Sequence, residues 1–381
     1  TIALYYPEGL NVANLILKNP LNIKWLFVAG KDFDTNLLPS NYLAGYFDTD
    51  SNFFVIKLVA IFSFFTFQKY LLINLCFSML SYSGVWRLYM FFYEQYPHMH
   101  KKLAIAIIYL PTFVFWSSGI LKDPICTGML GFFTYAFYNV LIKRKSVIKN
   151  MLISIASAYI IIIVKPYILF SFLPFYLYYL TFSNIGKIQN NFYKYLVVLM
   201  VFVLGIIGVY VVSNKLQDEM GAFAVDEIKS SVKTQQTNFI NMGEDAASSF
   251  SLGVTFDGSN SSLLKMAPAA VVATLFRPFL WESKKISTLL SSLESLAFMF
   301  FTLFVFFKSP LIFFGSLVED RLILFCIFFS LVFALFVGAT TLNFGTLVRY
   351  KIPCMPFYLI GLMLIYEKIK AQKLLKPAIR G

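Results

Sequence analysis

The sequence has few charged residues and few of the side chains that most often bind metals. Charged residues make up only 13% of its 381 positions, and it contains two histidines and four cysteines. The cysteines, Cys76, Cys126, Cys326 and Cys354, all lie inside apolar runs, without the paired spacing of a metal site or of a small disulfide framework. We therefore interpret them as packing residues.

Several catalytic motifs are also absent. The chain has no P-loop, no G-x-S-x-G elbow and no H-E-x-x-H. These absences argue against ATP-driven transport, serine hydrolysis and zinc proteolysis. The net charge of +13 does not indicate nucleic-acid binding, because the basic residues lie in short clusters between apolar segments, where they set membrane orientation.

The dominant feature is the apolar content. Hydrophobic residues make up 59% of the chain, with 44 Phe and 23 Tyr, and the mean hydropathy is +0.72. Apolar runs near the length of a membrane helix recur along it, so we predict an all-α fold, a polytopic transmembrane helix bundle of about nine spans. The predicted spans are residues 71–89, 103–118, 124–142, 151–164, 167–182, 195–212, 286–307, 322–340 and 352–366.

We divide the chain into four regions. They are an outer N-terminal region with a juxtamembrane helix (1–70), a first transmembrane bundle (71–213), an extracytoplasmic loop domain (214–285), and C-terminal transmembrane helices with a basic cytoplasmic tail (286–381). The chain begins at Thr1 without an initiator Met, so we expect upstream residues, with room there for a further transmembrane helix.

The basic loops predict an orientation. Lys143, Arg144, Lys145 and Lys149 form the densest basic cluster, which indicates a cytoplasmic loop. Alternation from this loop places nearly all of the net positive charge inside. We expect a multi-pass protein of the bacterial inner (plasma) membrane.

Two apolar segments are harder to place. Residues 52–67 contain Lys57 and follow a region with more acids than lysines, so we predict a re-entrant or juxtamembrane helix on the outer side. The alternative is a true span with an internal amino terminus. Residues 263–276 are short and contain Pro268, and we predict an interfacial helix there.

Cationic side chains near membrane depth are costly, and they are therefore candidate functional residues. Arg277 in LFRPFLWE and Arg349 in LVRYKIP do not follow the cytoplasmic bias, and Lys351 adjoins the second. Their donors suit phosphate oxygens, although anchoring to lipid headgroups is an alternative. Lys165, in IIIIVKPYILF, could hold an anionic headgroup in a cavity or snorkel to the interface.

The candidate acids lie on the same predicted outer side. Asp48 and Asp50 form a D-x-D pair, which could supply a general base or hold a divalent cation, or could simply form a turn. Lys122 and Asp123 occupy a tight turn, where Asp123 could cap a helix or belong to a site. Glu294, about two turns into its predicted helix, could pair with an outer arginine or face a cavity.

This layout resembles the GT-C superfamily of membrane glycosyltransferases and, more loosely, bacterial polysaccharide polymerases. The similar features are Asp48 and Asp50 followed by the helix at 52–67, the segment PTFVFWSSGILKDPI with Asp123, and the late segments LFRPFLWE and LVRYKIPCMPFYLIGLML. The resemblance implies a polyprenyl-phosphate-linked sugar donor that enters from the bilayer, and transfer on the outer face. A first-loop carboxylate would be the base, and Asp48 or Asp50 could match it.

Our leading hypothesis is a glycosyltransferase of cell-envelope glycan assembly, with a lipid-linked sugar donor, a glycan acceptor and membrane lipids as partners, and no nucleic acid. The alternatives are a polymerase of polysaccharide repeat units and a lipid or glycan transporter or flippase without catalysis. The sequence leaves open whether a divalent cation is needed. The catalytic candidates are Asp48, Asp50 and Asp123. The substrate-binding candidates are Lys122, Lys165, Arg277, Glu294, Arg349 and Lys351.

Overall fold

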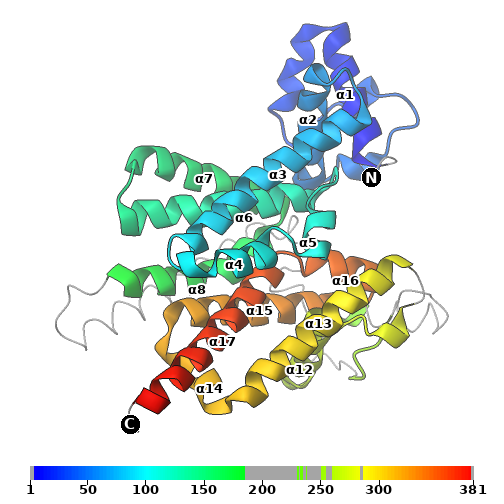
Figure 1. Ribbon diagram of the computed structural model, residues 1–381. Helices are drawn as coiled ribbons and strands as arrows, with labels where there is room; N and C mark the ends of the chain where they lie inside the picture. Colours follow the sequence, from blue (N-terminus) through cyan, green and yellow to red (C-terminus); the bar gives the residue numbers. More distant parts are fainter. Residues whose placement is uncertain are drawn as a thin grey trace. The chain divides into compact units, whose positions relative to one another are not determined.

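The computed structural model describes residues 4–184, 230, 232–234, 237, 250–254, 260–283 and 286–378, and every regular element in them is a helix. The chain divides into two compact units (Figure 1). The first unit contains residues 4–97 and 114–169. The second contains residues 98–113, 170–184 and the described residues from 230 onward. The helices α5 (Pro111–Trp116) and α8 (Pro166–Asn184) contribute residues to both.

The first unit begins with a small helical region. Two helices, α1 (Tyr5–Lys18) and α2 (Asp50–Phe65), pack against each other, and the short 3₁₀ helices η1 to η4 connect them (Figure 1). The helices approach closely because Gly9 has no side chain: a Cβ atom there would lie 2.3 Å from Cγ1 of Val59. The 3₁₀ segments are Pro20–Leu26, Gly30–Asp32, Thr35–Leu37 and Ala44–Tyr46.

Three longer helices complete the first unit. They are α3 (Tyr70–Tyr93), α6 (Lys122–Tyr138) with its π-helical extension η6 (Asn139–Lys143), and α7 (Val147–Val164). Helix α6 packs against both α3 and α7. Glycines allow the backbones of α3 and α6 to touch, since a Cβ atom at Gly131 would lie 2.0 Å from the carbonyl oxygen of Gly84.

The second unit is built around α15 (Arg321–Thr340), which packs against α12 (Asn260–Phe276) and α17 (Met355–Ala378). Buried aromatic rings from three helices of this unit form part of its core: Phe172 of α8 contacts Phe325 and Phe329 of α15 and Phe357 of α17. The remaining elements are η5 (Pro97–Met99), which begins in the first unit, α4 (His100–Ile107), η9 (Leu280–Glu282), α13 (Ile286–Lys308), α14 (Pro310–Glu319) and α16 (Phe344–Tyr350).

The chain has the helices of a multi-pass membrane protein. Five helices among the described residues are long and apolar enough to cross a bilayer, and the bent pair α16 and α17 would add a sixth. The surface of helix α7 suits contact with lipid better than contact with water. Leu152, Ile155 and Tyr159 are exposed, whereas Ser154 and Ser157 are buried. The five are Tyr70–Tyr93, Lys122–Lys143, Val147–Val164, Thr288–Lys308 and Arg321–Thr340.

The prediction of a single span at 103–118 was wrong. The structure has two short helices there, α4 and α5, separated by residues 108–110. Pro111 provides the physical reason, because proline lacks the N–H that a continuing helix needs and disfavours helical backbone in the residue before it. Of the other predicted spans, 167–182 forms the shorter apolar helix α8, and 195–212 lies outside the described residues.

Two further segments are helical where a helix was predicted. Residues 52–67 fall largely in α2, which has 16 residues and is not among the candidate spans. Residues 263–276 belong to α12, which packs along α15; a Cβ atom at Gly338 would lie 2.1 Å from the carbonyl oxygen of Ala270. Much of the predicted loop domain at 214–285 lies outside the described residues.

Candidate functional site

A buried ion pair joins α6 to the junction between α7 and α8. Helix α6 begins at Lys122, and Asp123 is its second residue, with 2% of its surface exposed. Lys165 follows the last residue of α7, and Pro166 begins α8. The Nζ atom of Lys165 lies 2.5 Å from Oδ1 of Asp123. The ammonium group of Lys165 thus pairs with a carboxylate inside the protein and does not extend to the surface. Binding of an anionic headgroup by Lys165 stays a prediction.

The first turn of α2 meets the first turn of α6. Lys122 Nζ donates a hydrogen bond to Ser51 Oγ over 2.8 Å. Asp50, one residue before Ser51, accepts a hydrogen bond of 2.6 Å from the backbone N–H of Gly30. The structure thus gathers predicted catalytic and substrate-binding residues from three distant parts of the first unit. We call this group the α6 cluster: Asp50, Ser51, Lys122, Asp123 and Lys165.

The two acids of the D-x-D pair lie in different environments. Asp48 is exposed in the loop before α2, whereas Asp50 is half-buried and bonded to Gly30. Among the described residues, no group of three or more His, Cys, Asp or Glu side chains could hold a metal ion.

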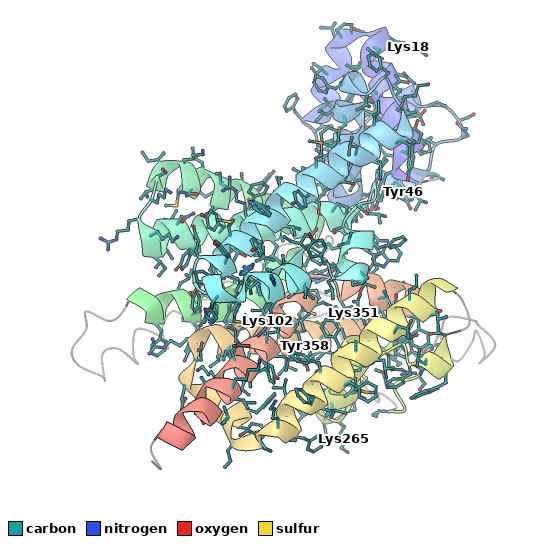
Figure 2. The ribbon with its side chains drawn as sticks, in the orientation of Figure 1. Lys18, Tyr46, Lys102, Lys265, Lys351 and Tyr358 are labelled. Atoms are coloured by element: carbon teal, nitrogen blue, oxygen red, sulfur yellow. The ribbon has the colours of Figure 1, made fainter. Side chains whose placement is uncertain are left out.

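A second group of polar residues surrounds a buried lysine in the second unit. Lys351 lies between α16 and α17, beside α13 (Figure 2), and only 1% of its surface is exposed. Its Nζ atom donates to Ser295 Oγ over 2.9 Å and to the backbone carbonyl of Arg277 over 3.1 Å. Ser295 Oγ donates to the same carbonyl over 3.3 Å.

Glu294 adds a carboxylate to this group. It accepts hydrogen bonds from the hydroxyl of Thr112 and, over 2.8 Å, from the backbone N–H of Thr112 in the first turn of α5. Its charge and that of Lys351 attract each other. We call this group the α13 cluster: Thr112, Arg277, Glu294, Ser295 and Lys351.

The guanidinium group of Arg277 contacts its own loop and two more distant segments of the second unit. Its Nε and Nη2 atoms bond the carboxylate of Glu282, and Nη1 donates to the carbonyl of Ser251 over 2.8 Å. The group also lies over the rings of Phe250 and Phe344, 4.4 and 5.4 Å from their centres. These contacts stabilise the LFRPFLWE segment, and phosphate binding by Arg277 stays a prediction. Arg349 lies half-buried on α16, two positions before Lys351.

Sequence reasoning missed the hydroxyl groups of both clusters. The hydroxyl groups of Ser51, Ser295 and Thr112 each bond a predicted site residue. The sequence offered one indication of these hydroxyl groups: Ser51 directly follows the candidate Asp50, and Ser295 directly follows the candidate Glu294. Serine and threonine are common in membrane helices, where they bond the backbone of their own helix, so that signal is weak.

Each cluster, taken by itself, combines a carboxylate with a cationic side chain. A carboxylate can accept a proton from a sugar hydroxyl. Ammonium and guanidinium groups bind phosphate oxygens through charge-assisted hydrogen bonds. No known protein family, curated protein or solved structure matches the chain. The similarity to GT-C enzymes therefore stays a prediction from the sequence.

Proposed function

We propose that the chain is a membrane glycosyltransferase that uses a polyprenyl-phosphate-linked sugar on the extracytoplasmic face of the bacterial inner membrane. Its role would be in cell-envelope glycan assembly. The observation that carries the proposal is the buried Asp123–Lys165 ion pair at the ends of apolar helices. Ionisable residues in such places are costly to bury, and in membrane proteins they mark substrate and ion pathways.

Asp123 is the base in this proposal. Its carboxylate accepts the proton of the acceptor hydroxyl while that oxygen attacks C1 of the donor sugar. The new C–O bond forms as the bond between C1 and the phosphate oxygen breaks, and polyprenyl phosphate leaves with the electron pair. Lys165 positions the carboxylate, and Lys122, adjacent to Asp123 in the chain, binds the anionic leaving group.

The test measures sugar transfer from a polyprenyl-phosphate donor by the full chain in proteoliposomes. We expect Asp123→Asn to insert in the membrane with lowered stability, because Lys165 loses its charge partner, and to lose transfer. Asp48→Asn and Asp50→Asn test the bases that the sequence resemblance implies. The matched control is Glu94→Gln, which removes a carboxylate that pairs with Lys143 elsewhere in the first unit, and it should retain activity.

A charge swap separates catalysis from folding. Asp123→Lys combined with Lys165→Asp keeps an ion pair but moves the carboxylate to the α7–α8 junction. This variant should recover stability without recovering transfer. Full activity in Asp123→Asn would exclude Asp123 as the base, and full activity in all three Asn variants would exclude each of the candidate bases. The lengths of the products separate a single transfer from polymerisation of repeat units.

One observation favours a transporter as the second candidate. Helices α16 and α17 form a broken pair bent by 63°, and Lys351 lies in the break. Transporters often build midplane binding sites at such discontinuous helices. This candidate predicts movement of a lipid-linked glycan across proteoliposomes with no new glycosidic bond, and it predicts that Asp123→Asn retains that movement.

A further inference from the structure

Helix α14 exposes an apolar face that no protein segment covers in the described part of the chain. Leu311, Phe314 and Val318 are 88, 58 and 81% exposed, and their spacing places them on one side of the helix. The opposite side buries Ser316. A short helix with this arrangement is suited to lie against lipid, since its apolar side chains face outward.

The end of α13 continues this apolar surface. Phe300, Phe304 and Phe307 are exposed along α13, and α14 follows α13 after a single residue. The two helices are held together by Phe306, whose ring contacts Phe314 with the ring centres 5.9 Å apart. Figure 1 shows α14 between the ends of α13 and α15, beside α17.

Two lysines from different helices meet at the edge of this surface. Lys308, the last residue of α13, places Nζ 4.6 Å from the centre of the Tyr366 ring and 3.4 Å from its hydroxyl oxygen. Lys370 of α17 places Nζ 5.0 Å from the centre of the same ring. Among the described residues no ion pair joins either lysine to a carboxylate. Nearby Glu367 pairs with Lys102.

Asp320, at the end of α14, pairs with Lys368 over 3.0 Å. The Tyr366 ring contacts both ammonium groups, and the Phe304 ring, whose centre is 4.8 Å from Lys308 Nζ, contacts one of them. In the described part of the chain no carboxylate pairs with either lysine, so aromatic rings and the Tyr366 hydroxyl offset the repulsion between them. A bound anion would lower this electrostatic cost. Basic residues beside aromatic rings at helix ends bind lipid headgroups in membrane proteins.

We propose that α13, α14 and α17 form a binding site for one anionic phospholipid. The phosphodiester lies beside Lys308 and Lys370, and the acyl chains lie along Phe304, Phe307 and the exposed face of α14. The positive charge selects an anionic headgroup, and the adjoining apolar surface selects a lipid over a free anion. The orientation predicted from the basic loops would put this site in the cytoplasmic leaflet, on the side opposite the proposed sugar transfer, and lipid binding here does not depend on that transfer.

The experiment is native mass spectrometry of the full chain in detergent, with phosphatidylglycerol or phosphatidylcholine of identical acyl chains. We expect phosphatidylglycerol to bind more tightly. In Lys308→Gln/Lys370→Gln this preference should fall roughly fivefold for each lysine removed. The matched control is Lys145→Gln/Lys149→Gln, which removes the same charge at two exposed lysines and should leave the preference unchanged.

Three results would overturn the proposal. They are an equal loss of preference in both double variants, no loss in either, or displacement of the bound lipid by inorganic phosphate alone. If the double variant does not fold, the single variant Lys370→Gln is tested instead. Lys370 is exposed and contacts the Tyr366 ring, so its replacement should leave the fold intact. The preference of this single variant should fall by roughly fivefold.

Discussion

Lys165 and Asp123 form the most deeply buried ion pair in the described part of the chain, with side chains 7 and 3% exposed and Nζ 2.5 Å from Oδ1. The pair couples the first turn of α6 to the α7–α8 junction, 42 positions away. Burying either charge alone would carry a large desolvation penalty, and the attraction between the two charges offsets that penalty. The same pair thus contributes to the first unit's stability and supplies the proposed base.

Removing one partner of this pair should destabilise the first unit. Lys165→Met leaves the Asp123 carboxylate buried without its ammonium partner, and we expect a loss of about 3–5 kcal/mol in the free energy of unfolding. Asp123→Leu combined with Lys165→Met should recover most of it. Chemical unfolding in detergent measures both.

The control for this prediction is Lys143→Gln, which breaks the more exposed pair with Glu94. Its cost should be no more than about 1 kcal/mol. If Lys165→Met were as stable as this control, the buried pair would have no structural role.

The glycine contact between α3 and α6 should be intolerant of any side chain. A Cβ atom in Gly131→Ala would lie 2.0 Å from the Gly84 carbonyl oxygen, so the helices must move apart, at a cost of about 1–3 kcal/mol. Gly315→Ala in α14 is the control, because the nearest atom to the new Cβ, Glu319 Oε1, would be 4.0 Å away. Alanine there should be neutral or stabilising, and comparable melting temperatures for the two variants would contradict the packing argument.

Glu294 and Lys351 should be energetically coupled. Glu294→Gln removes a charge but keeps an acceptor for Thr112, and Lys351→Met removes the donor to Ser295. Each should lower stability, and together they should cost less than their sum, by about 0.5–3 kcal/mol. A double-mutant cycle measures this coupling. The control cycle pairs Glu294→Gln with Lys265→Met at an exposed lysine of α12 (Figure 2) and should be additive.

Because of Lys57, the free energy of unfolding should depend on pH. Its Nζ atom donates to the carbonyl of Val28 over 2.6 Å. Burial lowers the pKa of Lys57 from 10.5, and the charge of Asp50 offsets part of this shift. Between the lowered pKa and 10.5 the unfolded chain binds more protons than the folded one, so this residue's contribution to stability increases as pH rises.

The measurement compares the parent chain with Lys57→Met by chemical unfolding across the alkaline range. The stability of the parent relative to the variant should rise with pH up to about 10.5, the usual lysine value. Lys31→Met, at an exposed lysine of the same region, is the control. A difference that stays constant with pH would exclude this role for Lys57.

Apolar density alone predicted most of the helices. Residues 71–89, 151–164 and 322–340 fall within α3, α7 and α15, because a long apolar run in lipid must satisfy its backbone hydrogen bonds within a helix. The same reasoning failed at 103–118, where local proline chemistry ended one helix and began another. It also could not show that α12 packs along α15, since that contact depends on Gly338 meeting a distant backbone.

The sequence by itself determined that the chain is helical and apolar, and it indicated which of the few charged residues are candidate site residues. Only the tertiary structure decided their partners: Asp123 with Lys165, Glu294 with Thr112, and Lys351 with Ser295. Apolar periodicity determines which residues can lie in a membrane helix. The partner of a buried charge depends on which helix ends the packing brings within a few ångströms, and that choice rests on close contacts such as those at Gly84 and Gly131.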